Sequence, residues 1–385
     1  MKLTRFFAGF IIAVFIIAVL PTKAMAEDLA QNSKSAVLME LTSGDIVYEK
    51  APDEAMPPAS ITKIMTILLI YEAVSDGKIR WDDEVTISEH AASMGGSQVF
   101  LEEGEIQTVK ELTKCIVIAS ANDAAVAMAE FIGGSEAEFV SLMNERANEL
   151  EMENTHFVNA CGLDAEGHVS SAEDVAKMSR QLLLDHPEVT EHTTTWMDTI
   201  THKTRRGENE FGLTNTNKLI KWYNGATGLK TGSTNGALYC LSGSAKRNGM
   251  EFVAVVMGAS DPKVRFKEVM EMLDYGFANY EAMEGIAEGE VVGDIAIHKG
   301  VSDRTDVKAK NSFSVVVRKG DGNTLEHDIE LVPFIKAPFD EGEKAGEIIY
   351  RVGDKEVGRV DIVTAGRAEK MGFVDMFIEM FRKCV

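Results

Sequence analysis

Ser60 and Lys63 have the spacing of a nucleophile and its base. Residues three apart share one face of a helix, so the Lys63 amine can accept the proton of the Ser60 hydroxyl. The tetrad Ser60-Ile-Thr-Lys63 follows Pro57-Pro58 at the start of an apolar run. A serine at such a place is also a common helix N-cap. The tetrad alone therefore leaves two uses open, an active serine with a lysine base and a helix cap.

The same spacing occurs twice more, in Ser75-Asp-Gly-Lys78 and Ser260-Asp-Pro-Lys263. Gly77 is typical of a helix C-cap and Pro262 of a helix start, so neither pair is expected to lie on one continuous helical face. Only the Ser60 tetrad begins an unbroken helical pattern, which ends at Ser75-Asp-Gly.

Two later motifs complete a set of three. Ser120-Ala-Asn122 follows an apolar run, and Lys230-Thr-Gly232 lies at the end of a predicted strand. A second Ser-x-Asn, Ser233-Thr-Asn235, is out of order and is set aside. Ser-x-x-Lys, Ser-x-Asn and Lys-Thr-Gly in this order are the signature of active-serine penicillin-binding proteins and related β-lactamases.

The chain resembles the low-molecular-mass D-alanyl-D-alanine carboxypeptidases of peptidase family S11 over nearly all of its length after the leader. The resemblance rests on residues 57–66, 120–124, 162–164, 215–219 and 228–232. It implies an α/β (α+β) penicillin-binding/β-lactamase-like transpeptidase domain with an antiparallel sheet, then a small all-β sandwich domain and a C-terminal amphipathic helix. It also implies an enzyme without a cofactor that removes the terminal D-alanine of peptidoglycan pentapeptides and is inhibited by β-lactams.

The resemblance implies three catalytic residues. Ser60 would attack the carbonyl of the penultimate D-alanine, Lys63 would take its proton, and Ser120 would relay a proton to the departing amine. Lys63 is expected to be partly neutral, because burial and the nearby charge of Lys230 both disfavour an ammonium. The backbone N–H groups of Ser60 and Ser233 would form the oxyanion hole.

The resemblance also implies a set of substrate-binding residues: Asn122, Lys230, Thr231, Gly232, Ser233 and Arg265. Asn122 would hold a substrate peptide group, Lys230 would supply a fixed positive charge, and Thr231 would bond the terminal carboxylate with help from Arg265. Each has an ordinary alternative, since Asn122 could start a helix and Arg265 could be a solvated surface charge. Ser233 stands where relatives often carry His, Tyr or Phe, which leaves substrate preference open.

The elements expected around these motifs form a mixed domain. A hairpin at 36–41 and 46–49 comes first, helices follow from Ser60, over 109–132 and over 136–150, and strands at 227–231, 237–245 and 252–257 precede a helix from Pro262. Helices inserted between a hairpin and a closing antiparallel sheet predict an α/β domain. Strand and turn patterns alone fill the segment up to Ala368, which predicts a β domain that acts as a spacer.

The two ends of the chain carry different signals. Lys2 and Arg5 precede an apolar stretch, and Ala24-Met-Ala26 offers a cleavage site, so residues 1–26 are predicted to be a signal peptide, with an uncleaved anchor as the alternative. The apolar face expected over 368–385 favours peripheral contact with the outer face of the cytoplasmic membrane. The predicted units are therefore 1–26, a catalytic domain 27–283, a β-sandwich 284–366 and a membrane-association helix 367–385.

Charge and motif content limit which partners, metals and bases the protein is expected to use. A formal charge of −22 without a basic block excludes nucleic acid as a favoured partner. No metal-ligand motif is present, and the histidines His156, His168, His186, His192 and His202 are predicted to be loop or surface residues rather than bases.

Two other functions stay open. A β-lactamase would usually carry a carboxylate for deacylation, but the chain has no Glu-x-x-Leu-Asn element. A catalytically silent wall-binding module would be free to lose Lys63 or Lys230, and both are present. An exported enzyme of the cell wall is the favoured hypothesis.

Overall fold

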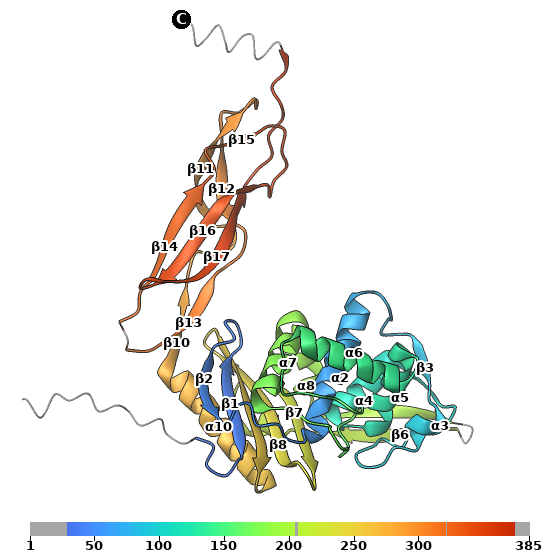
Figure 1. Ribbon diagram of the computed structural model, residues 1–385. Helices are drawn as coiled ribbons and strands as arrows, with labels where there is room; N and C mark the ends of the chain where they lie inside the picture. Colours follow the sequence, from blue (N-terminus) through green and yellow to red (C-terminus); the bar gives the residue numbers. More distant parts are fainter. Residues whose placement is uncertain (1–28, 205–206, 321, 374–385) are drawn as a thin grey trace, which may run out of the picture.

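The computed structural model describes residues 29–204, 207–320 and 322–373. Within these ranges the chain forms an α/β domain followed by an all-β domain that extends from the end of its last helix (Figure 1). The predicted signal peptide lies outside the described residues.

A five-stranded antiparallel sheet forms the centre of the first domain, in the order β2-β1-β9-β8-β7. Its strands are β1 (Ser35–Glu40), β2 (Ile46–Lys50), β7 (Ala226–Thr234), β8 (Leu238–Arg247) and β9 (Met250–Ala259). The N-terminal hairpin joins the late strands through the β1–β9 pairing, in which Val37 faces Val255. The predicted mixed domain with an antiparallel sheet is confirmed.

Both faces of this sheet are buried, and the central strand β9 carries a continuous apolar run from Phe252 to Met257. Val253 and Val255 of β9 face the core beneath the helices, whereas the alternating residues Phe252 and Ala254 face the core beneath α10 (Pro262–Asn279). Figure 1 accordingly shows α10 on the opposite side of the sheet from the other long helices.

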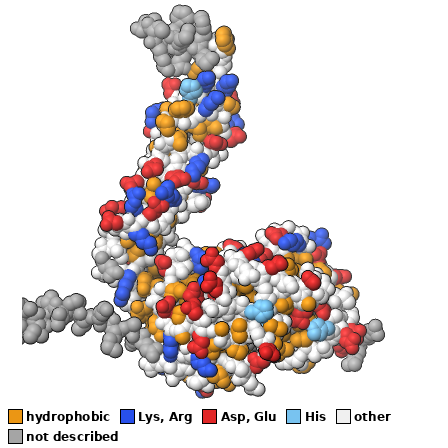
Figure 2. Space-filling view, viewed as in Figure 1, with side chains coloured by type: hydrophobic (Ala, Val, Ile, Leu, Met, Phe, Trp, Pro, Cys, Tyr) orange, Lys and Arg blue, Asp and Glu red, His pale blue; other side chains and the backbone are white. Residues whose placement is uncertain are grey.

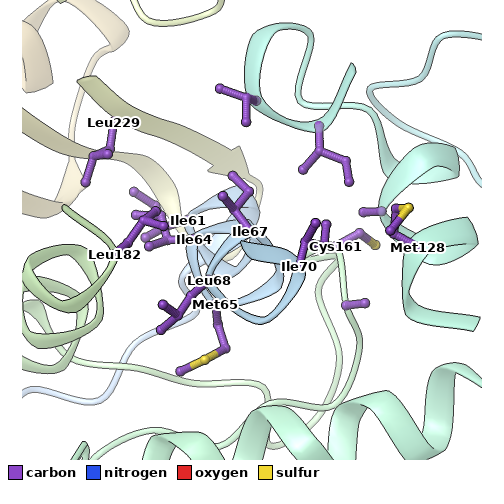
Figure 3. Packing of buried hydrophobic residues seen from close by; sticks show 14 of the residues in the cluster. Ile61, Ile64, Met65, Ile67, Leu68, Ile70, Met128, Cys161, Leu182 and Leu229 are labelled. Atoms are coloured by element: carbon purple, nitrogen blue, oxygen red, sulfur yellow. The ribbon is translucent and has the colours of Figure 1, made fainter. Parts of the chain in front are cut away.

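The helices that cover the first face bring the N-terminal motif to the sheet. They are the 3₁₀ turn η1 (Ala59–Thr62), α2 (Lys63–Ser75), α4 (Val109–Ile118), α5 (Asn122–Gly133), α6 (Glu136–Glu149) and α7 (Ala172–Asp185). Figure 3 shows Ile61 and Ile64 packed beside Leu182 of α7, with Leu229 of β7 close by. Tight packing of this kind fixes η1 and α2 against the strand that carries the third motif.

The helix expected over 109–132 is wrong as one element, because it is interrupted at Ser120. Helix α4 ends at Ile118, Ser120 adopts a positive φ of 60°, and α5 begins at Asn122. Apolar periodicity continues through the break since both helices are buried in the same core, so the pattern did not reveal it. The break moves Ser120 out of a helix and into a turn.

Short elements complete the first domain: β3 (Glu84–Thr86), α3 (Glu89–Ala92), β4 (Ile106–Thr108), η2 (Pro187–Val189), α8 (Thr190–Thr193), β5 (Met197–Thr204), β6 (Gly207–Thr214) and α9 (Leu219–Trp222).

The second domain consists of strands and turns, as predicted. Its six-stranded sheet has the order β14-β16-β17-β12-β11-β15, and β10 pairs with β13. The strands are β10 (Tyr280–Glu284), β11 (Val291–His298), β12 (Arg304–Ala309), β13 (Ser314–Arg318), β14 (Leu325–Leu331), β15 (Phe334–Lys336), β16 (Lys344–Val352) and β17 (Lys355–Thr364). Tyr350 is fully buried in its core and stacks on Phe313.

The C-terminal helix predicted over 367–385 does not begin where expected. Ala368 and Lys370 instead form single β-bridges with Phe339 and Gly300, which lie outside the named strands of the β domain. Residues 374–385 lie outside the described part of the chain. Among the described helices, none is long and apolar enough to cross a membrane.

Candidate active site

Ser60 lies in a turn that neighbouring backbone approaches closely. A Cβ atom at Gly162 would come within 1.9 Å of the Ala59 carbonyl oxygen, and one at Gly232 would lie 2.9 Å from the Pro58 carbonyl oxygen. Only glycine permits such approaches, and Gly162 also has a positive φ of 87°. The Ser60 turn is therefore held between the loop of Gly162 and strand β7.

Lys63 is the first residue of α2, and its amine lies at the centre of the site. Its Nζ is 3.1 Å from Ser60 Oγ, 2.6 Å from Asn122 Oδ1 and 2.6 Å from the Cys161 carbonyl oxygen. The side chain is fully buried, and this burial lowers the pKa of Lys63 to about 8. A substantial share of the amine is therefore neutral near pH 8.

The three partners of Lys63 determine where its lone pair points. Asn122 Nδ2 donates to the Gly95 carbonyl, so Oδ1 is the end of the amide that faces Lys63. Asn122 Oδ1 and the Cys161 carbonyl can only accept hydrogen bonds, and they take the two N–H groups of a neutral amine. The lone pair is left facing Ser60, whose hydroxyl can donate. This is the arrangement a general base requires.

The second motif is positioned by the break between α4 and α5. Ser120 is buried in the turn, and Asn122 follows it at the first position of α5 with its amide on Lys63. One hydrogen of Asn122 Nδ2 remains for a further acceptor after the bond to Gly95. Asp123 accepts the backbone N–H groups of Val99 and Leu101, which secures the 95–101 segment to α5.

The third motif lies on β7, beside the Ser60 turn. Lys230 is buried, and the pKa of its ammonium is well below the usual range because of burial and repulsion from Lys63 and Arg265. The Thr231 hydroxyl lies 2.8 Å from that of Thr216. Lys230, Lys63 and Arg265 therefore oppose one another's positive charge, and a bound anion would favour the charged form of each.

Arg265 lies at the start of α10 and is partly buried rather than a freely solvated surface charge. Its Nη1 donates to the Gly232 carbonyl at 2.9 Å and to the Cys240 carbonyl at 3.3 Å. Its Nε is buried without a hydrogen-bond partner among the described residues. The Arg265 guanidinium therefore holds the backbone of β7 at Gly232, the residue before exposed Ser233.

The structure adds groups that sequence reasoning missed. The carbonyls of Cys161 and Gly95 orient Lys63 and Asn122, and Thr216 contacts the Thr231 hydroxyl. Backbone carbonyls carry no sequence signal. Thr216 lies in the 215–219 segment on which the family resemblance rested, and that was the available signal.

Comparison with known proteins agrees with this geometry. The family model described as D-alanyl-D-alanine carboxypeptidase, peptidase S11, matches residues 22–261, and that of the penicillin-binding protein 5 C-terminal domain matches residues 280–370. The chain is 42% identical to D-alanyl-D-alanine carboxypeptidase DacF of Bacillus subtilis (strain 168) over 96% of each chain.

Two solved structures are also similar. The peptidoglycan synthesis regulatory factor (PBP3) of Streptococcus pneumoniae aligns with TM-score 0.74 and 26% identity, over 88% of this chain and 99% of that one. Penicillin-binding protein D2 of Listeria monocytogenes, in its ampicillin-bound form, aligns with TM-score 0.54 and 33% identity, over 64% of this chain and 98% of that one.

Proposed function

Because the chain belongs to the D-alanyl-D-alanine carboxypeptidase family, peptidase S11, we propose a reaction for it. In this reaction the protein removes the terminal D-alanine of peptidoglycan stem pentapeptides through an acyl-enzyme on Ser60. The enzyme class is a serine-type D-alanyl-D-alanine carboxypeptidase. The observation that carries the proposed mechanism is the Lys63 amine, with its pKa lowered to about 8 and its Nζ 3.1 Å from Ser60 Oγ.

Acylation begins when Lys63 takes the proton of Ser60 and the Ser60 oxygen attacks the carbonyl carbon of the penultimate D-alanine. The backbone N–H groups of Ser60 and Ser233 stabilise the oxyanion of the tetrahedral intermediate. The C–N bond then breaks as the proton held by Lys63 is relayed through the Ser120 hydroxyl to the departing D-alanine amine. Ser120 gives one proton and receives another, Lys63 returns to the neutral amine, and an ester remains on Ser60. Water hydrolyses this ester and restores the serine hydroxyl.

The terminal carboxylate of the substrate is bound by Lys230 and Thr231 of β7, with help from Arg265 of α10. Burial and the neighbouring Lys63 and Arg265 disfavour the charge of Lys230 and hold its pKa low. A bound carboxylate favours the ammonium form and raises this pKa. Asn122 and Gly232 lie where the peptide part of the substrate enters. This arrangement supports cleavage at a free C-terminus.

We propose that β-lactams acylate Ser60 and that the resulting ester is hydrolysed slowly. The acceptors that hold Lys63 are an amide and a carbonyl, and within the described residues no carboxylate contacts Lys63 to activate a deacylating water. A fluorescent penicillin is therefore expected to label the protein in equimolar amount and to remain bound after unreacted dye is removed. Fast turnover of the penicillin, followed by its ring-opening absorbance, would instead favour a β-lactamase.

The carboxypeptidase activity is tested with a diacyl-L-Lys-D-Ala-D-Ala peptide and an assay for free D-alanine. Release of one D-alanine per peptide is expected. Penicillin labelling without D-alanine release would favour the silent wall-binding module.

We further propose that the enzyme works outside the cytoplasm, with residues 1–26 as signal peptide, 27–283 as the catalytic domain and 284–366 as a β-sandwich spacer. The proposed membrane contact includes the distal tip of the β domain, defined as residues 298–301, 334–337 and 369–371. Gly300 bridges to Lys370, and β11 and β15 pair His298 with Lys336, so these segments adjoin.

The distal tip combines apolar and basic side chains with one exposed carboxylate, that of Glu369. Val301 and Phe334 are 64% and 52% exposed. Lys299, Lys336 and Lys370 are also exposed, and none forms an ion pair within the described residues. Figure 2 shows orange, blue and red side chains together at the end of the β domain away from the first domain. The terminal segment predicted to be amphipathic continues from this tip, which supports an anionic lipid surface as the partner.

Charge reversal at the distal tip is expected to weaken binding to anionic vesicles. Lys336→Glu/Lys370→Glu should bind phosphatidylglycerol vesicles at least roughly thirtyfold less tightly in a sedimentation assay at low salt, because each of the two lysines near such a surface contributes about 1 kcal/mol. Lys355→Glu, at the first residue of β17, is the control. Equal binding by the double variant and the wild type would contradict the contact.

A further inference from the structure

His168 lies in a loop, as expected, but this loop is buried behind the Ser60 turn. His186, at the end of α7, is also buried, and the expectation is wrong for His202, which is buried on strand β5. The side chain of His168 is 2% exposed, and its ring packs near Phe157. Its Nε2 lies 2.8 Å from Thr62 Oγ1, and its Nδ1 accepts the backbone N–H of Val158 at 2.9 Å. Both ring nitrogens are therefore engaged.

The two contacts determine the tautomer of His168. The Val158 N–H can only donate, so Nδ1 is unprotonated. Nε2 then carries the ring hydrogen and donates it to the Thr62 hydroxyl. The charged groups that face the ring are His156, which opposes protonation, and Asp164, which favours it. Burial outweighs Asp164 and lowers the pKa of His168 to about 4, so the ring is neutral at the pH where Lys63 works.

Thr62 belongs to the turn between the nucleophile and the base. The segment ending at His168, here the bracing loop (residues 156–168), contacts the same turn and helix at further points. Thr66 Oγ1 donates to the Ala160 carbonyl at 2.6 Å, and Lys63 Nζ donates to the Cys161 carbonyl at 2.6 Å. The carbonyl of Cys161 is one of the two acceptors that turn the Lys63 lone pair toward Ser60.

We propose that His168 is a positioning residue, which ties the bracing loop to Thr62 so that the Cys161 carbonyl stays on Lys63 and the amine stays aimed at Ser60. The proposal rests on the proposed acylation of Ser60. His168 touches neither the substrate nor the reacting atoms. Its action is mechanical, through a neutral ring that donates at one end and accepts at the other.

Two substitutions at this position separate hydrogen bonding from packing. In His168→Gln the amide can accept from Val158 with its oxygen and donate to Thr62 with its nitrogen, whereas His168→Leu removes both bonds. Acylation by a chromogenic penicillin is measured in the full-length protein, and the maximal rate is separated from the apparent dissociation constant. His168→Leu is expected to lower the maximal rate about ten- to one-hundred-fold with little change in the dissociation constant, because a displaced base slows chemistry more than binding. His168→Gln should stay within about threefold of wild type.

Coupling between the two partners gives a second measurement that tolerates a poorly folding leucine variant. Thr62→Val alone removes the acceptor, so it should lower the maximal rate whether or not His168→Leu folds. Where His168→Leu does fold, Thr62→Val/His168→Leu should show no decrease beyond that of the worse single variant. Exposed His156 lies in the same loop, and His156→Gln is the matched control. Thermal unfolding of each variant shows whether the rates were measured on folded protein.

The outcomes are distinguishable. Wild-type acylation rates in folded His168→Leu and in Thr62→Val, or losses that simply add, would overturn the positioning role while leaving the enzyme assignment intact. Failure of the wild type itself to react would overturn the acyl-enzyme instead. Nitrogen-15 NMR of histidine-labelled protein tests the ring directly: a neutral Nε2–H tautomer from pH 5.5 to 8.5 is expected, and an Nδ1–H tautomer or a charged ring would contradict the proposal.

Discussion

Ser60→Ala is expected to abolish D-alanine release and penicillin labelling together. The substitution removes the oxygen that forms the acyl bond, and neither Lys63 nor Ser120 can replace it as a nucleophile at this position. Loss of a nucleophile usually lowers turnover by at least about a thousandfold. The measurements are the D-alanine assay and fluorescence of the labelled band after denaturing electrophoresis.

The chain provides a matched control for Ser60→Ala. Ser75 is the last residue of α2 and belongs to a second Ser-x-x-Lys, but it is exposed, and Gly77 ends the helix with a φ of 70°. Ser75→Ala should keep full labelling and turnover. Labelling of Ser60→Ala that resists denaturation would show that the acylated residue is elsewhere and would end the Ser60 mechanism.

Lys63→Arg is expected to cause the second large loss. Arginine keeps the positive charge and can still donate to Asn122 and to the Cys161 carbonyl, but its pKa above about 12 leaves no lone pair for the Ser60 proton. Removing general-base catalysis should lower the acylation rate about a hundred- to ten-thousandfold. Stopped-flow or quenched labelling with penicillin measures this rate, and exposed Lys78→Arg is the control.

The wild-type pH profile tests the same residue without a substitution. Burial holds the pKa of Lys63 at about 8. The neutral amine is the active form, so acylation should fall as pH drops below about 8, by about tenfold for each pH unit. Above pH 8 the rate should level off. A rate that is constant from pH 6 to 9, or near-normal acylation by Lys63→Arg, would exclude Lys63 as the base.

Several features of the fold were predictable because they depend on short-range patterns. The Asn248-Gly249 turn has two positive φ angles, 50° and 77°, which is the conformation that an Asn-Gly pair between two strands favours in a tight hairpin. Pro262 begins α10, and apolar runs marked the strands on both sides of the turn. The interruption of 109–132 was not predictable, because a buried turn leaves the apolar period unchanged on either side.

The order and types of the motif residues, Ser60 with Lys63, Ser120 with Asn122, and Lys230 with Thr231, were determined by the sequence alone, and they sufficed to indicate the family and the reaction class. The tertiary structure decided how Lys63 becomes a base. Lys63 is buried by segments that are distant in the sequence and come together only when the chain folds. The same segments supply the Cys161 carbonyl that accepts from Lys63 and the Gly95 carbonyl that orients Asn122. Desolvation and hydrogen-bond direction depend on three-dimensional neighbours, and main-chain carbonyls are the same in every residue, so no pattern of side chains could reveal them.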